Sequence, residues 1–158
     1  RKVHLFFEEK LWFESGDGEF PVFDIGPCRV GIMVCFDWFF PESMRSLSLK
    51  GAQVVCHPAN LVLPYCQTAM VTRCLENRVF AVTANRTGTE ERAGKSLHYT
   101  GKSQITDTAG NILSRAGEDE ECAGVFDIDP AMALDKQLNA HNNLFGDRRP
   151  GFYRDVCR

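Results

Sequence analysis

The sequence predicts an α/β fold with a mixed sheet, and three features of its pattern lead to this class. Apolar, strand-like runs at residues 29–34 and 52–56 are each followed by a helix-like segment. A third apolar run at residues 79–84 follows the second of these helices. Residues 101–106 and 111–113 then form a hairpin pattern around an Ala-Gly turn. Alternating strands and helices are typical of parallel sheets, whereas a hairpin adds antiparallel pairs, so we expect both kinds in one sheet.

The first two strands are expected to pair with each other. Residues 20–24 alternate in polarity, a Gly-Pro turn follows at 26–27, and residues 29–34 are apolar on both faces. A strand that is apolar on both faces belongs in the middle of a covered sheet. Pro41 then suits the first turn of a helix over residues 42–50, because the missing N–H of proline costs nothing there.

The later part of the chain contains further helical and strand-like segments. A helix is expected over residues 67–77, and residues 124–128 are expected to form the last strand. An Asp-Pro pair then provides an N-cap and a proline at the first helical position, which predicts a helix over residues 129–138. The tail over residues 145–158 is charged and aromatic without a clear period, and we expect it to pack on a partner subunit.

Composition and charge exclude several classes of protein. The chain has 158 residues, of which 44% are hydrophobic and 25% charged, as expected for one globular domain. The net charge is −3 and the basic residues are scattered, so no basic face for nucleic acid or an anionic membrane is expected. A small molecule is therefore the expected partner. The chain opens without Met, and we expect residues 1–158 to be the C-terminal portion of a domain whose N-terminal part lies upstream.

The cysteines point to a reducing compartment rather than to a disulfide framework. The chain has seven cysteines, which is an odd number, at positions 28, 35, 56, 66, 74, 122 and 157. No two of them form a C-x-x-C pair. The spacing of cysteine and histidine also lacks the pattern of a zinc site. We expect neither a metal nor an organic cofactor. The N-terminus carries no apolar segment typical of a signal peptide or a membrane span, so the cytoplasm is the expected location.

The stretch GIMVCFDWFFPE places Cys35 at the carboxyl end of a predicted central strand, directly before a turn and a helix. Most free cysteines behave as small buried hydrophobic residues, which is one interpretation. Ligands bind beyond the carboxyl ends of parallel strands, however, and backbone N–H groups after such a turn lower a thiol pKa and stabilise an oxyanion. A nucleophile also needs a base. His57 or His98 would serve in a papain-like arrangement, but neither has a supporting motif.

Five short motifs, taken in order, resemble the nitrilase superfamily of carbon–nitrogen hydrolases. They are RKVHLF at 1–6, EK with FE within 9–14, VGIMVCFD with FPE within 30–42, HPAN at 57–60 and LENR at 75–78. The resemblance covers essentially the whole chain and is closest to the small amidases and N-carbamoyl-amine hydrolases, rather than to the true nitrilases. It implies an α-β-β-α sandwich with mixed sheets, no cofactor, and a homodimer or higher homo-oligomer.

The resemblance also implies a catalytic role for specific residues. Cys35 matches the nucleophile of a Glu–Lys–Cys triad, Lys2 matches the triad lysine, and Glu9 matches a second glutamate that orients the lysine and the substrate. The general-base glutamate of the family lies upstream of the lysine motif and is not within these 158 residues. The residue types suit a thioester mechanism, with Lys2 and the Phe36 N–H as donors to the oxyanion. Without the motif, Lys2 would be interpreted as an ordinary surface charge.

Other residues near the motifs have two possible roles. Asn60 and Trp38 are candidates for substrate binding, although Asn60 also suits a turn and Trp38 also suits the core. Asp37 is expected to hold the turn after Cys35. Glu76 and Arg78 are expected to form an ion pair. For the whole protein two interpretations stand: a cysteine-dependent hydrolase of an amide or N-carbamoyl amine, or a non-catalytic remnant that retains only the fold and a dimerisation surface.

Overall fold

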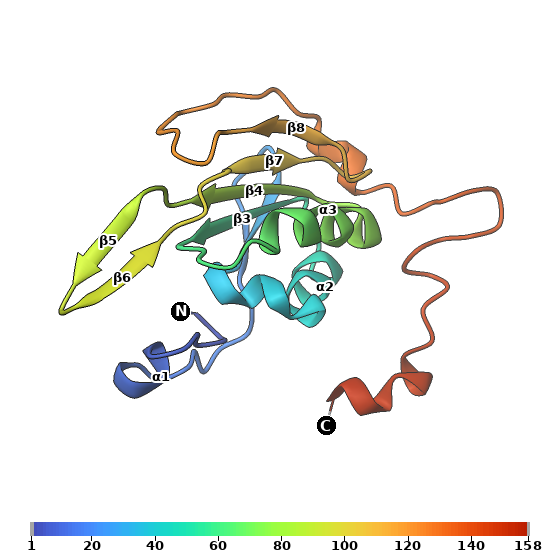
Figure 1. The fold of residues 1–158 in the computed structure, drawn as a ribbon. Coiled ribbons are helices and arrows are strands. Elements are labelled where there is room, and N and C mark those ends of the chain that lie inside the picture. The colour runs from blue at the N-terminus through green and yellow to red at the C-terminus, as the bar shows by residue number, and fades with distance from the viewer. Residues whose placement is uncertain (1, 158) are drawn as a thin grey trace.

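The computed structural model describes residues 2–157, so Arg1, the first residue of the RKVHLF motif, lies outside the described residues. Within this part of the chain, six strands form one sheet in the order β1-β2-β3-β4-β7-β8 (Figure 1). Their bounds are β1 (Val22–Asp24), β2 (Arg29–Ile32), β3 (Val54–Ala59), β4 (Phe80–Asn85), β7 (Gln104–Thr106) and β8 (Ile112–Arg115).

The sheet is mixed, as the sequence predicts. Strands β2, β3 and β4 run parallel to one another, and β1, β7 and β8 pair antiparallel with their neighbours. The parallel part is the α/β portion of the chain, and the antiparallel pairs come from the first hairpin and from the predicted later one. The carboxyl ends of β2 and β3 therefore lie next to each other, which is the edge where ligands bind in such sheets.

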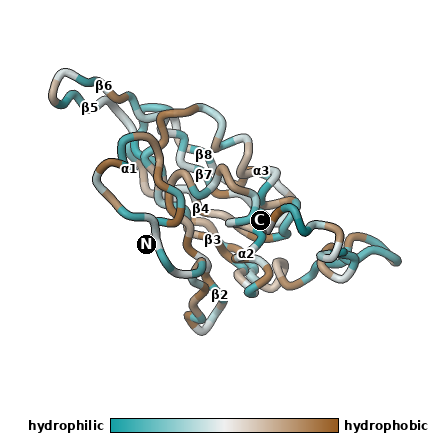
Figure 2. Tube along the Cα trace, turned by 90° about the horizontal axis from the view of Figure 1, so that it is seen from below, coloured by the Kyte–Doolittle hydropathy of each residue, from teal (hydrophilic) through white to brown (hydrophobic). Residues whose placement is uncertain are grey.

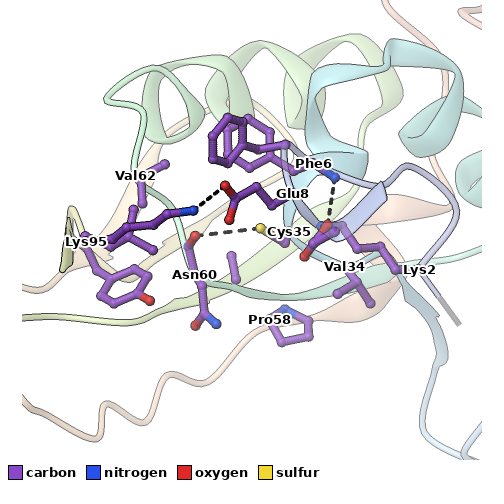
Figure 3. A pocket seen from close by; sticks show the side chains of 14 residues that line it. Lys2, Phe6, Glu8, Val34, Cys35, Pro58, Asn60, Val62 and Lys95 are labelled. Carbon is purple, nitrogen blue, oxygen red and sulfur yellow. Dashed lines mark hydrogen bonds and ion pairs between the residues drawn. The ribbon is translucent and has the colours of Figure 1, made fainter. Parts of the chain in front are cut away.

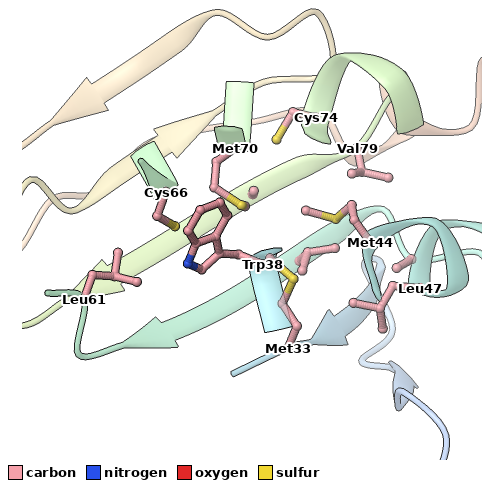
Figure 4. Close-up of a cluster of buried hydrophobic side chains, with 12 residues drawn as sticks. Met33, Trp38, Met44, Leu47, Leu61, Cys66, Met70, Cys74 and Val79 are labelled. Atoms are coloured by element: carbon pink, nitrogen blue, oxygen red, sulfur yellow. The ribbon is translucent and has the colours of Figure 1, made fainter. Parts of the chain in front are cut away.

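Helices α2 (Pro41–Leu49) and α3 (Cys66–Asn77) pack together on one face of the sheet (Figure 1). Pro41 occupies the first turn of α2, as expected. The hydrophobic core lies between these helices and the strands (Figure 4), and its buried members include Met33, Trp38, Met44, Leu47, Val55, Leu61, Cys66, Met70, Cys74 and Val79. A smaller cluster on the opposite face combines Val54 and Phe80 with Ala133.

Gly31 on β2 marks the closest approach between the sheet and α2. A Cβ atom at this position would lie 2.9 Å from Leu47 Cδ2 and 3.1 Å from Ala52 Cβ. Both distances are shorter than ordinary van der Waals contact, and Gly31 itself is buried. The absence of a side chain therefore allows α2 to pack directly on β2, and it fixes the direction of the chain that leads from β2 into α2.

The chain after β8 differs from the prediction. Residues 124–128 form no strand, and the helix expected over 129–138 is reduced to the 3₁₀ helix η2 (Pro130–Ala133). The predicted N-cap is correct, because the Asp129 carboxylate accepts a hydrogen bond from the Ala131 N–H at 2.9 Å. Leu134 and Leu138 are 65% and 54% exposed, so a longer helix would have no packed apolar face to stabilise it.

Residues 134–157 continue past α3 and away from the sheet (Figure 1). They contain only the short 3₁₀ helices η3 (Pro150–Phe152) and η4 (Arg154–Cys157). Several of their apolar side chains are exposed, among them Phe152 at 78%.

Hydrophobic residues are also visible along the chain around β2 in Figure 2. None of the helices in residues 2–157 has the length and apolar character needed to cross a bilayer.

A short helix and a hairpin of two strands were not predicted from the sequence. The short helix α1 (Glu9–Trp12) follows the first motif, and strands β5 (Thr89–Arg92) and β6 (Lys95–His98) form a separate hairpin that projects from the sheet (Figure 1). The two residues that connect β5 and β6, Ala93 and Gly94, both have positive φ angles, of 50° and 74°. A two-residue hairpin turn requires this conformation.

Candidate active site

Cys35 lies in a sharp turn between β2 and α2. It is the first residue of the 3₁₀ helix η1 (Cys35–Phe39) and has a φ angle of 47°, in the left-handed region. This conformation is uncommon for a residue other than glycine and requires support from the surrounding structure. The order strand, turn and helix is the order predicted from the sequence, and the turn leaves the Cys35 side chain partly accessible.

Asp37 holds one side of this turn, as expected. Its buried carboxylate accepts the Val34 N–H on Oδ2 at 2.9 Å. The Oδ1 atom accepts the His4 main-chain N–H at 2.9 Å and lies 2.9 Å from His4 Nδ1. Asp37 therefore connects the turn that carries Cys35 to the N-terminal segment that carries Lys2.

His57 on β3 holds the other side of the turn. Its Nε2 lies 2.9 Å from the main-chain oxygen of Cys35, and its Nδ1 lies 3.2 Å from Thr83 Oγ1. Both ring nitrogens have partners, and neither partner is the Cys35 thiol. His98 lies on the projecting hairpin, where its Nδ1 is 3.0 Å from Thr89 Oγ1. The contacts of these two residues therefore do not support a papain-like cysteine–histidine pair.

A cavity of about 450 Å³ opens above Cys35 (Figure 3). Cys35, Lys2 and Glu9 all line it, so the structure brings together the three residues for which the resemblance implies catalytic roles. The Lys2 ammonium donates to Glu9 Oε2, and the same oxygen accepts the Phe6 N–H at 2.7 Å. The Lys2 side chain is only 13% exposed, which keeps its positive charge inside the cavity rather than in bulk water.

Asn60 and Trp38 differ in their relation to this cavity. Asn60 lines it, and the Asn60 main-chain oxygen lies 3.9 Å from Cys35 Sγ, while the side-chain amide points away from the sulfur (Figure 3). Trp38 is 5% exposed and belongs to the hydrophobic core (Figure 4). It does not line the large cavity but borders a side cavity of about 20 Å³, which it shares with Cys35, Phe36 and Asn60. Trp38 therefore has the packing position that the sequence left open as its alternative role.

Lys95 also lines the cavity, although no pattern in the sequence indicated it. It comes from β6, and its ammonium forms an ion pair with Glu8 of the N-terminal segment across the cavity mouth (Figure 3). Leu97 and Tyr99, from the same part of the chain, also line the cavity. No motif surrounds Lys95, and the contact joins residues 87 positions apart, so the sequence contained no signal for it.

The environments of the cysteines separate Cys35 from the thiols of the core. Burial raises the pKa of Cys66, Cys74 and Cys56 above the ordinary value of a thiol. Thiols of this kind stay protonated and react slowly. Cys35, by contrast, lines the cavity. Among residues 2–157, no three His, Cys, Asp or Glu side chains gather in a group that could hold a metal ion.

The ion pair expected between Glu76 and Arg78 does not form. Glu76 instead pairs with Arg73, at 3.1 Å, on the same helix. Arg78 follows α3 with a φ angle of 47°, and this left-handed conformation directs its guanidinium toward Asp135, at 3.6 Å. The end of α3 therefore separates the two side chains.

Comparison with known proteins identifies the family. The carbon–nitrogen hydrolase family matches residues 1–135, and the chain therefore belongs to this family, which is part of the nitrilase superfamily. The chain is 52% identical to a protein named nitrilase from Pyrococcus abyssi, over 97% of the chain and 57% of the relative. It is 29% identical to N-carbamoylputrescine amidase from Solanum tuberosum, over 98% of the chain and 57% of the relative.

A solved structure of an amidase from Nesterenkonia sp. AN1 is similar in fold, with a TM-score of 0.78 and 29% identity. The match covers 98% of the chain and 54% of the amidase. In that amidase, which carries a glutamate-to-glutamine substitution, the acetamide moiety of fluoroacetamide is covalently added to the active-site cysteine. The chain thus spans little more than half the length of the relatives it matches.

Proposed function

We propose that the full-length protein hydrolyses non-peptide carbon–nitrogen bonds with Cys35 as the nucleophile. The observation that carries this proposal is the convergence of Cys35, Lys2 and Glu9 on one cavity. The thiol can attack a carbonyl carbon, the fixed positive charge can stabilise the oxyanion, and the carboxylate holds the ammonium in place. Membership of the carbon–nitrogen hydrolase family supports the same class of reaction.

The proposed reaction passes through a thioester. Cys35 Sγ bonds to the carbonyl carbon, and the oxygen becomes an oxyanion that the Lys2 ammonium and the Phe36 N–H stabilise. The carbon–nitrogen bond then breaks and the nitrogen leaves as ammonia after taking a proton. Water hydrolyses the thioester and frees the thiol. The general base that accepts the thiol proton is assigned to a glutamate upstream of Lys2, as the resemblance implies, and Glu9 orients the lysine.

Amides and N-carbamoyl amines are the proposed substrates. The similarity to an N-carbamoylputrescine amidase supports the second group, and the similarity to an amidase from Nesterenkonia sp. AN1 supports the first. Nitriles are a second candidate, because the relative from Pyrococcus abyssi carries the name nitrilase. We also propose a homodimer or larger homo-oligomer, in which the exposed apolar side chains of the C-terminal segment are covered.

The test is the intact mass of the full-length protein after treatment with iodoacetamide, alone and with a panel of amides, N-carbamoyl amines and nitriles. We expect fast alkylation of Cys35 that the true substrate slows, together with release of ammonia. Cys35→Ala should abolish both, whereas Cys122→Ser, which changes an exposed cysteine elsewhere, should abolish neither. Slow labelling spread over several cysteines, with no ammonia, would support the non-catalytic remnant instead.

A further inference from the structure

His57 is a buried residue that the proposed reaction does not use directly. Its side chain has no exposed surface, and its two ring nitrogens contact Cys35 O and Thr83 Oγ1. His57 on β3 lies directly opposite Thr83 on β4, so the sheet register fixes the second contact. A buried histidine with a partner on each ring nitrogen does more than fill space in the core. In the neutral ring one nitrogen carries the proton and the other does not, so the partner of one nitrogen determines whether the other donates or accepts.

These contacts define the tautomer of His57. A carbonyl oxygen only accepts hydrogen bonds, so Nε2 must carry the proton that it donates to Cys35 O. In the neutral ring Nδ1 is then an acceptor, and it accepts a hydrogen bond from the Thr83 hydroxyl. Burial lowers the pKa of His57, which outweighs the opposing effects of its bond to Cys35 and of the Asp37 carboxylate. The ring is therefore held neutral with its proton on Nε2.

The bond from His57 acts on the peptide group that joins Cys35 to Phe36. This peptide is trans, because no cis bond occurs in the described residues, so the Phe36 N–H points to the side opposite the Cys35 carbonyl. The first amides of a helix have no acceptor within that helix, which leaves the Phe36 N–H available. Phe36 and Cys35 also border the side cavity of about 20 Å³, which is large enough for one water-sized atom.

We propose that His57 is a positioning residue that fixes and polarises the Cys35–Phe36 peptide, so that the Phe36 N–H stabilises the oxyanion, and that Thr83 selects the required tautomer of His57. The role rests on the proposed hydrolase function. A hydrogen bond to a carbonyl increases the positive charge on the N–H of the same peptide. The bond from His57 to the Cys35 carbonyl also helps to hold Cys35 in its left-handed conformation, whereas Asp37 holds the preceding residue through the Val34 N–H.

Two reactions of the same thiol separate this role from a purely structural one. Alkylation by iodoacetamide displaces iodide and forms no oxyanion, whereas acylation by p-nitrophenyl acetate does form one. Loss of a donor to the oxyanion therefore slows acylation but leaves alkylation unchanged. The variants are His57→Leu, which removes the donor, and His57→Gln, which places an N–H donor at about the distance of Nε2 from Cβ. All are made in the full-length protein and checked for folding by thermal denaturation.

We expect His57→Leu to slow acylation by about 10- to 100-fold, below the effect of removing a whole oxyanion donor. Alkylation should change by less than about twofold, and His57→Gln should restore most of the acylation rate. Thr83→Val keeps the imidazole but removes the hydroxyl, so it should shift the ratio of the two rates in the same direction by a smaller factor. Thr83→Ser keeps the hydroxyl and should restore the ratio.

Equal losses in acylation and alkylation would overturn the proposal, because they would mean that the whole turn had moved. An unchanged ratio in both His57→Leu and Thr83→Val would overturn it as well. The Thr83 variants preserve the test if His57→Leu does not fold. If the unsubstituted protein is alkylated at Cys35 but acylated by neither the ester nor any amide, the hydrolase function itself fails, and this role fails with it.

Discussion

The Lys2 ammonium and the Phe6 N–H donate to the same oxygen of Glu9. Glu9 begins helix α1, and its N–H donates to the Phe6 carbonyl at 3.0 Å, so the segment between Lys2 and Glu9 closes on itself. One carboxylate thus fixes the conformation of this segment and the position of the ammonium in the cavity that Cys35 also lines. Lys2 is thereby suited to the role of a fixed positive charge in the cavity.

Lys2→Ala is expected to lower kcat by about 100-fold or more, because it removes a donor to the oxyanion. The measurement is ammonia release by the full-length protein with the substrate found in the labelling experiment. Lys10→Ala is the matched control, since Lys10 is exposed on α1 and does not line the cavity. If Lys2→Ala retained normal turnover, or if Lys10→Ala lost as much, the assigned role of Lys2 would be wrong.

Glu9→Gln should separate the electrostatic role of Glu9 from its structural role. The amide oxygen still accepts the Phe6 N–H, so we expect little change in Tm. The negative charge beside Lys2 is lost, so kcat should fall by at least about tenfold. Glu14→Gln, at an exposed position of the same segment, should change neither quantity. A large fall in Tm with an unchanged kcat would reverse this assignment.

Lys95→Ala tests the ion pair across the cavity mouth. Lys95 and Glu8 are 63% and 41% exposed, so their pairing contributes little to stability. It does connect the projecting hairpin to the N-terminal segment, and both line the cavity. We expect KM to change several-fold while Tm does not. Lys102→Ala is the control, because Lys102 pairs with Glu118, at 2.9 Å, away from the cavity. Equal effects of the two substitutions on KM would contradict a specific role for Lys95.

The sequence predicts the part of the site that neighbouring residues determine. The apolar run before Cys35 and the proline six residues after it define strand, turn and helix within a short stretch, and local patterns of this kind are readable. The position of Lys2 in the cavity that Cys35 lines has a different origin. It depends on the Asp37 contacts to His4, which join separate segments, and only the family resemblance pointed to it.

The hairpin of β5 and β6 and the end of the predicted helix over 129–138 show why other elements were missed. Most side chains of β5 and all of those of β6 are exposed, so no alternation of buried and exposed residues identifies these strands. The segment after Asp129 has a good N-cap but no partner for its apolar residues. A cap starts a helix, whereas packing determines how far it continues.

Gly31→Ala is expected to destabilise the protein by about 1–3 kcal/mol, the usual cost of overpacking a core. The new Cβ would lie 2.9 Å from Leu47 Cδ2, and Leu47 is fully buried and cannot move aside freely. Urea denaturation gives the free energy of unfolding. Gly18→Ala is the control, because a Cβ at Gly18 meets nothing within 4 Å. A Gly31→Ala variant as stable as the Gly18→Ala variant would show that α2 can shift away from β2 without cost.

Lys136 should make the stability of the protein depend on pH, and a substitution can isolate this contribution. Its ammonium donates to Asn77 O and Arg78 O, both at 2.8 Å, and so caps the carboxyl end of α3. Burial, followed by the charges of Arg78 and Arg45, lowers the pKa of Lys136 from 10.5 to about 8. The unfolded chain therefore binds this proton more tightly than the folded chain. Stability should rise with pH between about 8 and 10.5, where only the unfolded state keeps the proton.

Lys136→Met isolates this effect, because methionine has a similar length and does not titrate. The other titratable groups are present in both proteins, so their contributions cancel in the difference. We expect the free energy of unfolding of the unsubstituted protein, relative to Lys136→Met, to increase by an amount of order 1 kcal/mol from pH 8 to pH 10.5, since Lys136 is only partly buried. The measurement is urea denaturation at several pH values. A difference that stays constant or decreases over this range would mean that the folded protein does not favour the neutral amine, and that the two carbonyls at the end of α3 stabilise the ammonium enough to offset its burial.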